Sequence, residues 1–80
     1  MKGIYLLGID IGTSACKVAV FDRKGQVKAA ATGDYPVYYP REGWVEQNPE
    51  EWWEAVCQAI REVLEKGQIA PEEIAGIGID

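Results

Sequence analysis

A clear helical pattern near the middle of the chain, set among strand-like segments, restricts the possible folds more than any other feature. Asn48 can cap this helix, Pro49 suits its first position, and Glu51 stands where a capping-box partner is expected. Lys66 and Gly67 supply the signals for its end. Apolar residues at three-and-four spacing define the expected buried face: Trp53, Val56, Cys57, Ile60, Val63 and Leu64.

Four other segments have the composition of β-strands. Residues 4–11 are apolar and rich in β-branched side chains, and we expect this strand to be buried on both faces because polar alternation is missing. Residues 16–22 form a second candidate, and a turn at 22–25 with Gly25 leads into a third at 26–34. The third is weaker because three consecutive alanines have low strand propensity. Residues 74–80 form the fourth candidate.

The order of these segments predicts an α/β fold with a mixed sheet. Short turns between the first three strands favour an antiparallel meander, and a strand that follows a crossover helix is usually parallel to its neighbour. The predicted order is therefore β-β-β-α-β. Residues 35–47 hold prolines and aromatic residues without periodicity, which indicates a packed, irregular loop. The last strand lacks a cover for its second face, so we expect residues 1–80 to be part of a larger protein.

Composition excludes several classes of function. The chain has 80 residues, a net charge of −5, no histidine and no basic run. Triads that need histidine are excluded within it, and neither nucleic acid nor an anionic membrane is an expected partner. No segment is long enough to span a membrane or resembles a signal peptide. Cys16 and Cys57 lack metal or redox spacing, so we expect two buried thiols in a cytoplasmic protein.

The chemistry-bearing motif is Gly8-Ile9-Asp10-Ile11-Gly12-Thr13-Ser14, with Lys17 on the returning strand. A carboxylate in a buried strand is costly unless it is paired or bound to a cation. A glycine turn lets backbone N–H groups face an anion, while hydroxyls and a lysine add further phosphate ligands. These are the parts that phosphoryl transfer needs. The sequence has neither a Walker A loop nor a dinucleotide-binding GxGxxG turn.

Each of these residues also has a structural explanation. Asp10 could cap its own turn, and the hydroxyls of Thr13 and Ser14 could satisfy turn backbone groups. Lys17 could be a solvated strand residue. Asp80 could face a substrate loop or could have no role. We favour packing over sugar stacking for the three tryptophans, which are Trp44, Trp52 and Trp53.

Two stretches resemble a known family. GIDIGTSACKVAVFD is similar to the first phosphate-binding hairpin of the actin, Hsp70 and sugar-kinase superfold, which is ribonuclease H-like. PREGWVEQNPEEWWEAV resembles the FGGY family of carbohydrate kinases, and xylulokinases in particular. The resemblance covers essentially all 80 residues. It implies that residues 1–80 are the N-terminal part of the first domain of a kinase.

The resemblance also implies an activity and a set of ligands. The parent enzyme would transfer the γ-phosphate of ATP to a sugar hydroxyl, with a xylulose-like substrate favoured. Asp10 matches the acid that orients Mg²⁺, and Lys17 matches a position near the terminal phosphates. The residues that match the turn cradling the β- and γ-phosphates are Gly12, Thr13 and Ser14. Ala15 replaces a hydroxyl found in other members, which puts one phosphate contact in doubt.

The same resemblance places other parts of the active site beyond residue 80. The family's catalytic aspartate, its adenosine-binding motifs and its sugar-binding loop have no counterpart here, so the chain alone is not expected to be active. A homodimer is possible for the full-length enzyme. Two alternatives remain open: a chaperone or filament ATPase of the same superfold, and a non-catalytic module that self-associates through an exposed sheet edge.

Overall fold

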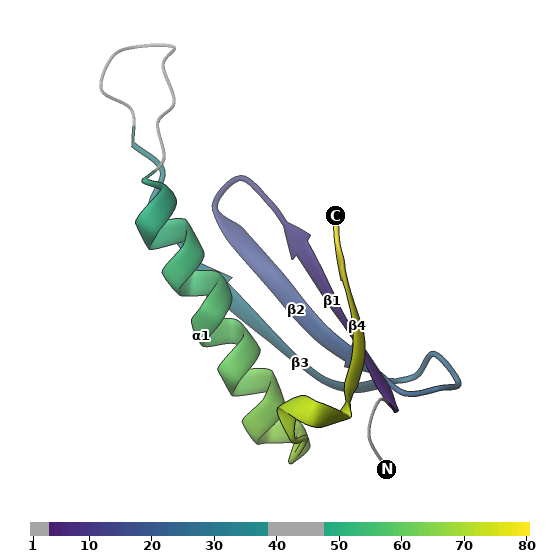
Figure 1. Cartoon of the computed structure of the whole chain (residues 1–80). Coiled ribbons are helices and arrows are strands. Elements are labelled where there is room, and N and C mark those ends of the chain that lie inside the picture. The colour runs from purple at the N-terminus through teal and green to yellow at the C-terminus, as the bar shows by residue number, and fades with distance from the viewer. Residues whose placement is uncertain (1–3, 39–47) are drawn as a thin grey trace.

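The chain folds into a twisted four-stranded sheet, and one helix lies along one face of this sheet (Figure 1). The computed structural model describes residues 4–38 and 48–80. The elements are β1 (Tyr5–Ile11), β2 (Ala15–Phe21), β3 (Val27–Asp34), α1 (Pro49–Gly67), the short 3₁₀ helix η1 (Pro71–Glu73) and β4 (Ile74–Ile79). This is the predicted order.

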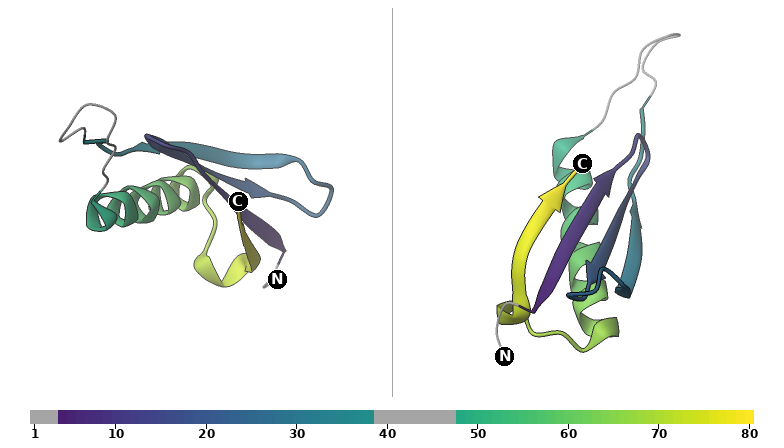
Figure 2. Two further views of the ribbon diagram at one scale, coloured as in Figure 1. Left: turned by 90° about the horizontal axis from the view of Figure 1, so that it is seen from above. Right: turned by 90° about the vertical axis from the view of Figure 1, so that its right-hand side faces the viewer.

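The strands lie in the order β3-β2-β1-β4. β1 pairs antiparallel with β2 and β2 antiparallel with β3, so the predicted meander is confirmed. After α1 the chain returns to the sheet, and β4 pairs parallel with β1 (Figure 2). The turn before β3 is also as predicted, because Gly25 has a positive φ of 81° that suits glycine.

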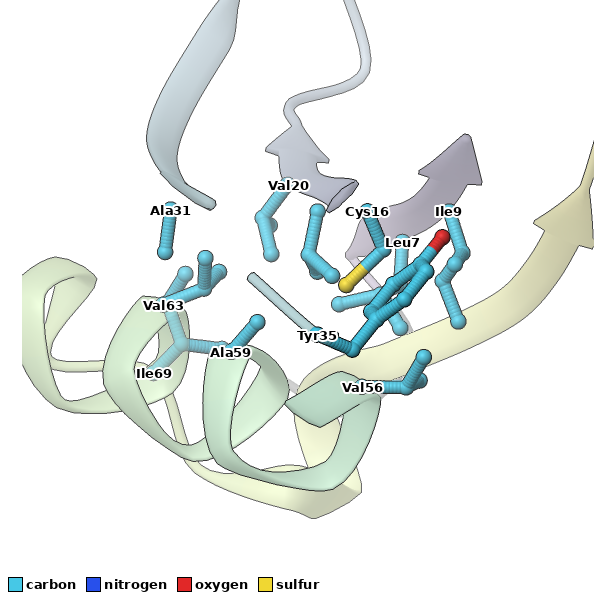
Figure 3. Close-up of a cluster of buried hydrophobic side chains, with 11 residues drawn as sticks. Leu7, Ile9, Cys16, Val20, Ala31, Tyr35, Val56, Ala59, Val63 and Ile69 are labelled. Atoms are coloured by element: carbon cyan, nitrogen blue, oxygen red, sulfur yellow. The ribbon is translucent and has the colours of Figure 1, made fainter. Parts of the chain in front are cut away.

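The core lies between α1 and one face of the sheet (Figure 3). Alternate residues of β1 and β2 point into it, as the period of a strand requires. The helix contributes residues at positions 56, 59 and 63, which share one side. The buried apolar residues are Leu7, Ile9, Cys16, Val18, Val20, Ala31, Tyr35, Val56, Ala59, Val63 and Ile69.

Small residues in β3 allow α1 to approach the sheet closely. A Cβ atom on Gly33 would lie 2.7 Å from the Ala55 carbonyl oxygen and 3.2 Å from Cys16 Sγ. Ala31 is buried beneath the same helix, and Ala29 packs against the core. The alanines that weaken the strand propensity of this segment therefore fit a face where a larger side chain would displace the helix.

The prediction that β1 is buried on both faces is wrong. Leu6 is 54% exposed, and Ile77 and Ile79 of β4 are 61% and 70% exposed. Leu6 lies on the face opposite α1, and no element within residues 4–38 and 48–80 covers that face (Figure 2). Ile77 and Ile79 pair with Leu7 and Ile9 and share their face, but they are exposed because β4 is the edge strand next to β1. The apolar composition of β1 therefore does not correspond to two covered faces in this chain.

The buried face of α1 differs from the prediction at its first turn. Trp53 is 58% exposed, and Trp52 packs against the core instead. Positions 52, 56, 59 and 63 follow the spacing of one helical face, whereas Trp53 is rotated about 100° away from Trp52. Cys57 is half-buried, and so only Cys16 is a fully buried thiol as predicted.

The start of α1 agrees with the sequence prediction at Asn48 and Pro49. Asn48 Oδ1 accepts a hydrogen bond from the Glu50 N–H at 3.0 Å, with Pro49 in the first turn. The Glu51 carboxylate, predicted as a capping-box partner, accepts hydrogen bonds from the Tyr38 hydroxyl at 2.7 and 2.9 Å. This contact ties the residues after β3 to the start of the helix.

The end of α1 lies one residue later than the glycine signal predicts. Gln68, and not Gly67, adopts the left-handed conformation, with φ 54°. A Cβ atom on Gly67 would lie 2.7 Å from Ile69 Cδ1, the end of a side chain that packs in the core. Lys66 is in the last turn as predicted, 3.9 Å from Glu62.

Part of the predicted loop at 35–47 lies outside the described residues. Trp44, for which we predict a packing role, falls there. Within the described ranges, no helix is long and apolar enough to cross a membrane.

Candidate phosphate-binding site

The turn between β1 and β2 holds the residues that the sequence predicts as phosphate ligands. The Gly12 N–H donates a hydrogen bond to the Ala15 carbonyl at 2.8 Å and closes the turn. Thr13 and Ser14 form its exposed tip. A Cβ atom on Gly12 would lie 3.0 Å from the Ala15 oxygen, so close approach of the backbone explains the glycine. Gly12, Thr13 and Ser14 therefore lie in one tight turn, and their role as phosphate ligands stays a prediction.

Tyr35, just after β3, contacts this turn from the core. Its N–H donates to the Ser14 carbonyl at 3.1 Å. Its hydroxyl donates to the Ala15 carbonyl at 2.9 Å and lies within hydrogen-bond reach of the Gly12 carbonyl. The ring is buried in the core cluster, with the hydroxyl at its far end (Figure 3).

Sequence reasoning missed this residue, because Tyr35 was only one of several aromatic residues in an irregular segment. A signal was present nonetheless. A tyrosine has an apolar ring that can enter the core and a hydroxyl that needs a hydrogen-bond partner when it is buried. The identity of that partner depends on the sheet order, which brings the end of β3 to the turn that begins β2.

The environment of Tyr35 favours its neutral form. Burial raises the pKa of the Tyr35 hydroxyl, and nearby Cys16 and Asp10 raise this pKa further, whereas a hydrogen bond with the Trp52 side chain lowers it. The net change in pKa is upward. The hydroxyl therefore keeps its proton at neutral pH and remains a donor to the turn carbonyls.

Asp10 and Lys17 lie opposite one another on β1 and β2, on the face that α1 does not cover. Side chains at directly opposed antiparallel positions project on the same face of the sheet. Asp10 is exposed, so the prediction of a buried carboxylate is wrong for the described chain. No ion pair between Asp10 and Lys17 is formed within residues 4–38 and 48–80.

A hollow of about 670 Å³ on this face is lined by Asp10, Lys17 and Asp80 together with apolar residues such as Phe21 and Ile79. The backbone of Asp80 holds the end of β4 against β1. Its N–H donates to the Ile9 carbonyl at 2.8 Å, and its carbonyl accepts from the Ile11 N–H at 3.0 Å. Because β1 and β4 are parallel, both carboxylates lie at the ends where these strands finish.

The Asp10 carboxylate and the adjoining turn fit an Mg²⁺ ion that is bound partly by the protein and partly by the phosphates of a nucleotide. Magnesium is commonly bound by one or two carboxylates, with phosphate oxygens and waters completing its shell. Asp10 is an exposed carboxylate beside a hydroxyl-bearing turn, which meets that need. The described residues contain no cluster of three or more potential ligands, so they do not form a site built from protein side chains alone.

Comparison with known proteins identifies the family. Residues 5–80 match the N-terminal domain of the FGGY family of carbohydrate kinases. The chain belongs to this family. The resemblance seen in the sequence is thereby confirmed at the level of the family.

Individual FGGY relatives agree with this assignment. A glycerol kinase from Desulfitobacterium hafniense is 44% identical over 75 residues, which are 94% of this chain and 15% of that protein. Solved structures titled gluconate kinase and ligand-bound xylulose kinase, both from Lactobacillus acidophilus, each match with a TM-score of 0.84 and 29% identity. Each match covers 95% of this chain and 15% of the other.

These structural neighbours are sugar kinases of the actin/Hsp70 superfold, so the predicted fold class is confirmed. The chain spans about 15% of the length of the curated relatives that it matches. The FGGY domain match therefore establishes the family and the fold of this chain.

Proposed function

We propose that this chain supplies the triphosphate-binding part of an ATP-dependent kinase that phosphorylates a hydroxyl group of a sugar or polyol. The observation that carries the proposal is the exposed turn from Gly12 to Ser14, with Asp10 and Lys17 on the adjoining ends of β1 and β2. Backbone N–H groups, hydroxyls, a lysine and a carboxylate are the groups that bind a metal-complexed triphosphate.

The proposed roles follow from the chemistry of each residue. The turn formed by Gly12, Thr13 and Ser14 binds the β- and γ-phosphates, and Lys17 adds positive charge on the same side of the sheet. Asp10 would hold Mg²⁺, directly or through its waters. Bound magnesium neutralises charge on the triphosphate and on the phosphoryl group in transfer. Fixed ligands lower the barrier because they need little reorganisation during the reaction.

We place the remaining parts of the active site outside this chain. Residues 1–80 have no histidine, and none of their side chains is assigned as the base that accepts the proton of the substrate hydroxyl. We propose that they are the first part of the first domain, and that the isolated chain does not catalyse. Location in the cytoplasm and a homodimer of the full-length enzyme remain predictions.

The acceptor is proposed only as a class. A xylulose-like sugar is the substrate that the resemblance favours, while relatives are named as kinases of glycerol, gluconate and xylulose. These names share a hydroxyl acceptor, which supports a polyol or sugar. The test measures ADP release by the full-length protein with Mg-ATP and each of these three acceptors.

Asp10→Ala in the full-length protein tests the proposed metal ligand. We expect kcat to fall about 100-fold or more, while the calorimetric affinity for the acceptor stays within about twofold. Glu54→Ala is the control, because this exposed carboxylate lies on α1, which packs on the opposite face of the sheet. Unchanged turnover in Asp10→Ala would remove the role of Asp10.

ATP hydrolysis that needs no acceptor would favour a chaperone or filament ATPase. Oligomers that form without any nucleotide binding would favour a self-associating module.

A further inference from the structure

We propose that Tyr35 is a positioning residue for the phosphate-binding turn, which it holds in its binding conformation from the core side. This inference rests on the proposed function, because it assigns a purpose to a contact within the same site. Tyr35 lies 20 residues or more along the chain from the two carbonyls that its hydroxyl contacts. The contact therefore depends on the tertiary fold and is not a local feature of the turn.

Tyr35 engages the turn through both its backbone and its side chain. Its N–H binds the Ser14 carbonyl, while its hydroxyl is shared between the carbonyls of Gly12 and Ala15. Three of the four carbonyls between residues 12 and 15 are thus directed toward one residue. The Ala15 carbonyl also accepts the Gly12 N–H, so it is held from two sides.

The direction of these carbonyls determines the direction of the amides of the turn. A peptide group is planar and trans, so its N–H points opposite to its C=O. When the Gly12 and Ser14 carbonyls face Tyr35, the N–H groups of the next residues, Thr13 and Ala15, are fixed in the opposite direction. A turn whose amides are fixed before binding loses less conformational entropy when it meets a phosphate.

Packing in the core holds Tyr35 in place, so its hydroxyl can fix the conformation of the turn. Only 5% of its surface is exposed, and its ring belongs to the same core cluster as Cys16 and Val56. Its hydroxyl cannot leave the turn without moving a packed aromatic ring, which is costly in a dense core. A residue on a loop or an exposed face would not hold the turn in this way.

Tyr35→Phe in the full-length protein removes the hydroxyl and keeps the ring. Tyr38→Phe is the matched control, because it removes a hydroxyl that binds the exposed Glu51 carboxylate and does not touch the turn. We expect Tyr35→Phe to raise the KM for Mg-ATP about 3- to 10-fold, as expected for one lost hydrogen bond. The KM for the acceptor should change less than twofold, and Tyr38→Phe should leave both constants unchanged.

A second measurement does not depend on kinase activity. Hydrogen exchange of the amides at residues 13–15 should become faster in Tyr35→Phe than in the wild type, with no such change in Tyr38→Phe. A lower melting temperature with unchanged KM for ATP and unchanged exchange would show a purely structural residue and overturn the inference. If the wild type transfers no phosphate to any acceptor, the proposed function fails, and unchanged exchange would then overturn the inference independently.

Discussion

Replacement of Gly33 by alanine tests whether the close contact between α1 and β3 determines the fold. The new methyl carbon would lie 2.7 Å from the Ala55 carbonyl oxygen, about 0.7 Å short of the 3.4 Å at which ordinary contact begins. The obstacle is helix backbone and cannot rotate away. The helix must therefore shift, which disturbs the packing of Val56 and Ala59.

We expect this overpacking to lower the free energy of unfolding by about 1–3 kcal/mol. For a domain of this size, each kcal/mol corresponds to about 4–8 °C in melting temperature. Gly78→Ala is the control, because no atom lies within 4 Å of a Cβ built at that position. Both variants would be unfolded in urea and followed by circular dichroism. If Gly33→Ala is as stable as Gly78→Ala, close approach of the helix does not require glycine, and the reasoning is refuted.

Three further predictions concern stability and reactivity. Asn48→Ala should lower the free energy of unfolding by about 0.5–2 kcal/mol in a urea titration, because it removes the acceptor for the Glu50 N–H, and an unchanged midpoint would contradict the cap. The pKa of Tyr35 is higher in the folded protein than in the unfolded chain, where it is about 10. Its neutral form therefore contributes fully to stability below about pH 10, and this contribution is lost as the pH rises through the pKa of the folded protein. Urea titrations across that alkaline range should show a decline that is smaller in Tyr35→Phe, and equal declines would contradict this assignment. Iodoacetamide should modify half-buried Cys57 before Cys16, which is 1% exposed, and the opposite order by mass spectrometry would contradict the burial.

The elements were predictable because their signals are local. Asn48 and Pro49 set the start of α1, Gly25 set the turn before β3, and the order of segments set the mixed sheet. The turn at Gly12 was likewise predictable from its own residues. Each of these signals lies within a few positions of the structure that it determines.

The predictions that failed concern which side chains are buried, and this depends on the elements that pack against each helix or strand in the folded structure. Sequence pattern alone did not show that α1 presents Trp52 and not Trp53 to the sheet, since the two differ by one position. It also did not show that Asp10 is exposed, because β1 has the composition of a strand that is covered on both faces. The contact of Tyr35 with the turn requires the strand order, which brings together residues more than twenty positions apart.

The parallel pairing of β1 with β4 has a consequence for the way the chain folds. Tyr5 pairs with Ile74, whereas the β1–β2 and β2–β3 pairings are joined by short turns. Hairpins close on microsecond timescales, but a pairing across most of the chain carries a larger loop-closure entropy and forms later. During synthesis at about 5–20 residues per second, β4 follows β1 after several seconds. The turn from Gly12 to Ser14 can therefore form within a nascent three-stranded meander, and the backbone of Asp80 joins β1 only afterwards.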